Sequence, residues 1–124
     1  MHAIGDIFEP NDPVISIALA LKKNGCRLFL LSNTCEPHFT FASSQFTFLK
    51  FFDGYVLSYE VGACKPEKKI YEKALELAGC GKEECFYTDD ILSYIEMARS
   101  LEIDAEQYKT PDDLIHHLNS RKIL

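Results

Sequence analysis

Residues 26 to 32, CRLFLLS, form an almost continuous apolar run. Such a run is typical of a strand covered on both faces, because a strand with one face in water alternates apolar and polar residues. The preceding segment, NDPVISIALALKKNG, has helix start signals in Asn11, Asp12 and Pro13 and ends with two lysines and a glycine. A buried strand that follows a helix in this way favours a parallel sheet with helical connections.

The alternation of strands and helices continues to the end of the chain. Further strands are predicted at residues 55–58, 85–88 and, with a weaker pattern, 104–108. Helices are predicted over residues 12–24, 66–79 and 92–101, after Pro111, and somewhere within the Phe-rich stretch 36–52. This order predicts an α/β fold of the Rossmann-like, doubly wound type, with a mainly parallel sheet and helices on both faces.

Length and composition narrow the class of protein. With 124 residues, we expect a single domain, and the net charge of −6 argues against nucleic acid or an anionic membrane as partner. The five cysteines form no CxxC pair, which indicates free thiols in a reducing compartment and no zinc site. No apolar run approaches the roughly 20 residues of a membrane span, and Asp6 and Glu9 argue against a signal peptide. We therefore expect a soluble cytoplasmic domain.

Polar side chains gather where the predicted strands end. In a parallel sheet the carboxyl ends of the strands meet at one edge, where ligands bind. Adjacent carboxylates suit Mg²⁺, a hydroxyl beside backbone N–H groups can hold phosphate, and a lysine can neutralise a transferring group. Taken singly, these are ordinary turn, cap and helix-start residues. Their combination at one edge favours a phosphoryl-transfer site made of Ser32, Asn33, Thr34, Lys65, Asp89 and Asp90.

Three segments in this order resemble motifs II, III and IV of the haloacid dehalogenase (HAD) superfamily, in its capped phosphatase and dehalogenase-like branch. They are LFLLSNT, VGACKPEKKIYEKAL and CFYTDDILSYIEMARSL, and the resemblance covers residues 12 to about 118. Members of the family hydrolyse small phosphate esters, or rarely carbon–halogen bonds, through a covalent aspartyl intermediate.

The resemblance implies a role for each residue of this edge. Ser32 would hold the phosphate, together with the backbone N–H groups of Asn33 and Thr34. Lys65 would stabilise the nucleophile and the transferring group. The aspartate pair, Asp89 and Asp90, would bind Mg²⁺ directly or through water, with Asp90 the more direct ligand.

The family nucleophile is the feature that the sequence does not offer. It belongs to an Asp-x-Asp motif after the first, central strand, whereas here Asp6 is followed at the second position by Phe8. We interpret AIGDIFEPND as the return from a cap. Residues 1–124 would then be a partial HAD-like core without its central strand, nucleophile or cap, with weak or absent Mg²⁺ binding and no activity alone. The sheet would close directly or with a strand from another chain, giving a homo-oligomer.

Smaller departures and alternatives complete this interpretation. The family often has a small polar residue after the acidic pair and an asparagine four positions after it, where Ile91 and Tyr94 stand here. The alternative function is a non-catalytic interaction module that uses the sheet edges and the Phe-rich stretch as contact surface, although we favour packing of those rings on the sheet. A response-regulator receiver is excluded, because there the acidic pair comes first and the lysine last. The substrate is not predicted.

Overall fold

The computed structural model describes residues 2–6, 12–45, 52–79 and 81–123. Its elements in chain order are β1 (His2–Asp6), α1 (Asp12–Lys23), β2 (Arg27–Ser32), α2 (Glu36–Gln45), β3 (Gly54–Leu57), α3 (Ser58–Val61), α4 (Lys68–Ala78), the 3₁₀ turn η2 (Lys82–Glu84), β4 (Cys85–Asp89), α5 (Leu92–Ser100), β5 (Asp104–Gln107) and α6 (Pro111–Ser120). The predicted strands and helices are confirmed, while β1, α3 and η2 were not predicted. The last part of the Phe-rich stretch, residues 46–51, lies outside the described residues.

The five strands form one parallel sheet in the order β3-β2-β1-β4-β5. This confirms the Rossmann-like, doubly wound class. The expectation that the central strand is missing is wrong: β1 lies between β2 and β4, with Ala3 opposite both Leu28 and Phe86. The physical reason is that a gap would leave backbone donors and acceptors of two buried strands unpaired, and a short segment of any extended sequence can satisfy them.

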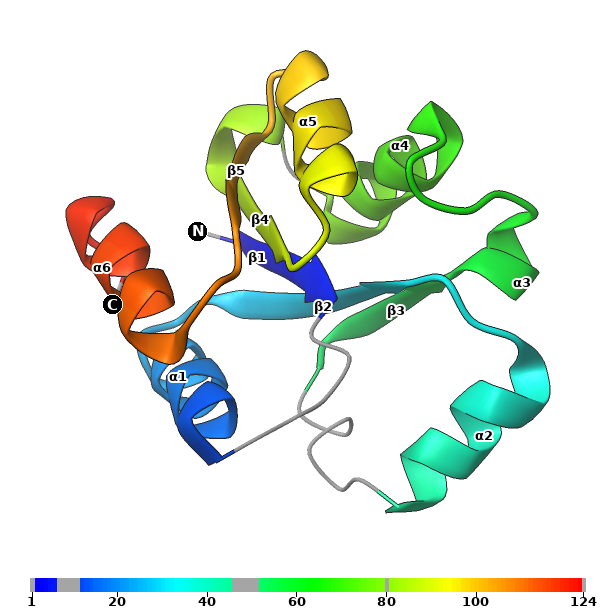
Figure 1. Cartoon of the computed structure of the whole chain (residues 1–124), viewed down its shortest axis with the longest axis horizontal. Coiled ribbons are helices and arrows are strands. Elements are labelled where there is room, and N and C mark those ends of the chain that lie inside the picture. The colour runs from blue at the N-terminus through cyan, green and yellow to red at the C-terminus, as the bar shows by residue number, and fades with distance from the viewer. Residues whose placement is uncertain (1, 7–11, 46–51, 80, 124) are drawn as a thin grey trace.

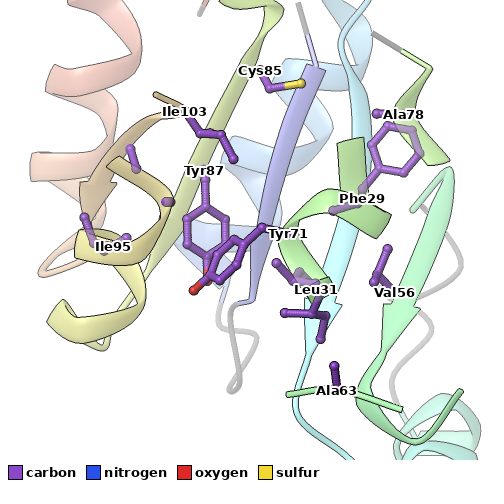
Figure 2. Close-up of a cluster of buried hydrophobic side chains, with 14 residues drawn as sticks. Phe29, Leu31, Val56, Ala63, Tyr71, Ala78, Cys85, Tyr87, Ile95 and Ile103 are labelled. Atoms are coloured by element: carbon purple, nitrogen blue, oxygen red, sulfur yellow. The ribbon is translucent and has the colours of Figure 1, made fainter. Parts of the chain in front are cut away.

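Two hydrophobic clusters cover the two faces of the sheet. Figure 1 shows α4 and α5 on one side of it and α1 and α6 on the other. Alternation along β2 and β4 divides their side chains between these faces, with Phe29 and Tyr87 toward the α4 and α5 side and Leu28 and Phe86 toward the α1 and α6 side. Figure 2 shows the first of these clusters. With helices on both faces, the free edge at the carboxyl ends of the strands is where polar groups can gather.

Local signals explain where the helices begin and end. Helix α4 buries Ile70, Tyr71 and Ala74 on one side and ends at Gly79, whose φ of 68° is a left-handed conformation that glycine adopts without steric cost. Helix α6 begins after Thr110, whose side chain accepts a hydrogen bond from the Asp113 N–H at 3.0 Å. Among the described residues, no helix is long and apolar enough to cross a membrane.

Candidate functional site

The site lies at the carboxyl edge of the sheet, where β2, β1 and β4 end side by side. Strand β2 ends at Ser32 and β4 ends at Asp89, and the backbone of Asp6 at the end of β1 is in register with that of Asp89. Lys65 precedes Pro66 in the segment before α4, and its ammonium reaches this edge. The structure therefore brings together residues from three separate segments of the predicted set.

A buried ion pair stands at the centre of the edge. The Lys65 Nζ donates to Oδ2 of Asp89 at 2.7 Å, and the two side chains are 1% and 2% exposed. Oδ2 also accepts from the Tyr87 hydroxyl at 2.6 Å, and Oδ1 accepts from the Ile91 N–H at 3.2 Å. Both oxygens of Asp89 are thus occupied by donors of the protein itself, so this carboxylate holds the lysine in place.

Asp90, in contrast, is exposed. Its pKa is raised, first by the hydrogen bond it shares with the Asp89 carboxyl group, then by partial burial and by the negative charge of Asp89. Its backbone carbonyl accepts from Gln107 Nε2 of β5 at 3.0 Å, which ties the start of the loop to the neighbouring strand. Of the two carboxylates, Asp90 is the one that solvent and a ligand can approach.

The predicted phosphate-binding segment, residues 32–34, makes two kinds of contact. The Asn33 side chain accepts from the Lys65 N–H at 2.7 Å and donates to the Lys65 carbonyl at 3.2 Å. The Thr34 N–H donates to Ser58 Oγ at 2.8 Å, and that hydroxyl donates back to the Thr34 carbonyl at 2.8 Å. Since Ser58 takes the Thr34 N–H, a phosphate would have to displace it, and the phosphate role of Thr34 stays a prediction.

Ser32 completes the edge as a buried polar residue, which is 6% exposed. Among the described side chains, the buried polar atom that lacks a hydrogen bond partner is Thr88 Oγ1, in the residue before Asp89. Ser32 lies at the end of β2, next to the central strand, and its contact with phosphate stays a prediction.

The oxygen atoms at this edge are of the kind that binds Mg²⁺, but they are too few to fill its coordination shell. Within the described ranges, no group of three or more His, Cys, Asp or Glu side chains lies close enough to hold a metal. Mg²⁺ commonly takes one or two carboxylates and completes its shell with water and phosphate oxygens. Asp90 offers one exposed carboxylate for this purpose, whereas Asp89 already accepts hydrogen bonds from Lys65, Tyr87 and Ile91.

Two functional neighbours were missed by the sequence analysis. Tyr87 was assigned only to a strand, and its hydrogen bond to Asp89 had no signal beyond its spacing of two from that residue, which places both on one face. Ser58, at the start of α3, had no signal in the sequence. Tyr94 was noted only as a departure from the family pattern, and the structure places its ring 4.9 Å from the Lys65 Nζ.

Comparisons with known proteins find similar sequences and similar structures. A family model described as haloacid dehalogenase-like hydrolase matches residues 2–101. Bifunctional epoxide hydrolase 2 of Mus musculus is 28% identical over 95 residues, which are 73% of this chain and 17% of that protein.

Two solved structures are also similar. An uncharacterized protein from Corynebacterium glutamicum superposes with a TM-score of 0.80 at 21% identity, covering 95% of this chain and 92% of that one, which shows the shared fold. A HAD family enzyme from Bacteroides thetaiotaomicron, solved with magnesium and inorganic phosphate, gives a TM-score of 0.66 at 30% identity. That match covers 76% of this chain and 52% of the enzyme, so the chain spans about half the length of this relative.

Proposed function

This chain belongs to the haloacid dehalogenase-like hydrolases, and on that basis we propose that its sheet edge binds Mg²⁺ and the phosphate group of small phosphate esters. The observation that carries the proposal is the buried pair of Lys65 and Asp89, at the same sheet edge as the exposed residue Asp90 and the buried residue Ser32. A lysine ammonium, a hydroxyl that can donate to a phosphate oxygen and a carboxylate that can bind a metal ion are groups that phosphoryl transfer uses for positioning and charge stabilisation.

Each residue has a distinct role in this proposal. Ser32 and the backbone N–H of Asn33 hold phosphate oxygens, and the Lys65 ammonium offsets their charge. Asp90 is the direct metal ligand, while Asp89 orients Lys65 and reaches the metal through water. When bound, Mg²⁺ would supply charge neutralisation on the phosphate oxygens.

We further propose that the chain by itself turns substrate over slowly or not at all. The residue two positions after Asp6 is Phe8, so the sequence has no carboxyl group there to protonate a leaving group. The register of β1 nevertheless places Asp6 beside Asp89, which makes Asp6 the candidate nucleophile to test. Expectations about a cap domain, the substrate specificity and the subcellular location rest on the same family resemblance.

Two measurements test the proposal. Inorganic phosphate is titrated into the protein in a calorimeter, once in the presence of Mg²⁺ and once with a chelator in its place. The wild type and Asp90→Asn are compared. We expect binding that requires the metal and is lost in the variant, and no phosphate binding by the wild type would refute the site. In parallel, an aryl phosphate is assayed for released phosphate. Robust turnover that both Asp90→Asn and Asp6→Asn abolish would overturn the claim of slow or absent activity and show that the reaction needs the Asp6 carboxylate.

The non-catalytic interaction module is supported by one observation. Several apolar side chains are exposed, among them Phe41 of α2 at 64% and Leu92 at 47%. Phe41 belongs to the Phe-rich stretch that this candidate function uses as contact surface, whereas single exposed apolar residues elsewhere are ordinary. Light scattering on the purified chain tests this candidate, because a monomer across a wide concentration range would contradict self-association.

A further inference from the structure

Tyr94 occupies the site in a way that the family pattern does not explain. It lies in the first turn of α5 and is half-buried, and its ring centroid is 4.9 Å from the Lys65 Nζ. A cation at this distance from an aromatic face is attracted by the negative charge of that face, more strongly when water is excluded. The ring therefore holds the ammonium from one side while Asp89 holds it from another.

The Tyr94 hydroxyl adds a second link to the same lysine. It accepts a hydrogen bond from Asn33 Nδ2 at 3.3 Å. The amide of Asn33 in turn bonds to both the N–H and the carbonyl of Lys65, so its orientation sets the position of the lysine backbone. Tyr94 thus acts on Lys65 at both ends, directly at the ammonium and through Asn33 at the backbone.

Tyr94 is itself held from the core. Its carbonyl accepts from the Tyr71 hydroxyl at 2.9 Å, and the Tyr71 ring packs edge-to-face on Tyr87 at 5.7 Å between centroids. Figure 2 shows these two rings side by side within the buried cluster. Tyr87 then donates to Asp89, the partner of Lys65. The contacts close a ring around the lysine, built largely from aromatic side chains.

We propose that Tyr94 is a positioning residue that keeps the Lys65 ammonium at the sheet edge, with Asn33 as its link to the lysine backbone. The consequence for phosphate binding rests on the proposed function of the site. The positioning itself does not, because it concerns contacts within the chain.

The test measures how accessible the Lys65 ammonium is, and it does not depend on any enzymatic activity. The chain is exposed to an amine-acetylating reagent, and the rate of labelling at Lys65 is followed by mass spectrometry. Tyr94→Leu should raise that rate about tenfold, since losing a desolvated cation–π contact is worth about that factor in the population of a displaced lysine. Tyr94→Phe keeps the ring and loses the hydroxyl that accepts from Asn33, so its rate should lie between those of the wild type and Tyr94→Leu. Tyr108→Leu, a tyrosine packed on the α1 and α6 side, is the matched control.

The outcomes separate the inference from the proposed function. An unchanged labelling rate in Tyr94→Leu, or an equal rise in Tyr108→Leu, overturns the positioning role. A labelling rate that is higher in Tyr94→Leu than in Tyr94→Phe supports it. Phosphate titration with Mg²⁺ forms the second arm, in which Tyr94→Leu should weaken binding about tenfold. If the wild type binds no phosphate, the proposed function fails and the labelling arm alone decides the role of Tyr94.

Discussion

Replacing Asp89 by asparagine should destabilise the fold by far more than a surface change of the same kind. The substitution keeps the shape of the side chain and removes its charge, which leaves the Lys65 ammonium, 1% exposed, without its partner at 2.7 Å. Removing one member of a buried ion pair typically costs about 3–5 kcal/mol. In the variant, the asparagine amide must also serve the two other donors that Asp89 accepts from, the Tyr87 hydroxyl and the Ile91 N–H, although it has only one acceptor oxygen.

Urea unfolding followed by circular dichroism measures this cost. With a slope of about 1.5 kcal/mol per M, the midpoint should fall by about 2–3 M, or the variant should be unfolded without denaturant. The control is Glu76→Gln, which removes a pair with Lys73 whose side chains are 73% and 53% exposed and should barely move the midpoint. A second variant, Lys65→Met with Asp89→Leu, should recover part of the loss because it leaves no unpaired charge. A loss below about 1 kcal/mol in Asp89→Asn would refute the reasoning.

Three further predictions concern the scaffold. Ile70→Ala in α4, where the residue is 0% exposed, should cost about 2–5 kcal/mol in urea unfolding. Gly25→Ala should cost about 1–2 kcal/mol from its φ of 88° alone, because an added Cβ meets nothing within 4 Å; an unchanged midpoint would contradict this. Burial alone would raise the pKa of Asp53, but the Leu28 N–H and the nearby Lys22 bring it below its usual range. A carboxyl group whose pKa is lower in the folded than in the unfolded state stabilises the fold at pH values above its unfolded-state pKa. Asp53→Asn should therefore be less stable than wild type at pH 7, and the difference should shrink as the pH falls below about 4.

The candidate site was predictable to the extent that its residues follow strands with clear patterns. Ser32 and Asp89 end the two strands with the strongest apolar runs, and parallel pairing necessarily brings such ends to one edge. The sequence did not predict that Asp89 binds Lys65, because this depends on which carboxylate of the pair faces the lysine. The bond between Ser58 and Thr34 was likewise hidden, since it joins residues 24 positions apart.

The sequence by itself determined the class of fold, the position of most elements and the set of polar residues at the sheet edge, because apolar periodicity and turn residues are local properties of the chain. Only the tertiary structure decided what fills the middle of the sheet. Strand β1 has no strong pattern of its own, and its place between β2 and β4 follows from the need to pair the backbone groups of both neighbours. Tertiary packing also decided that Tyr94 and Asn33 hold Lys65, since such contacts arise only when segments far apart in the chain are folded against one another.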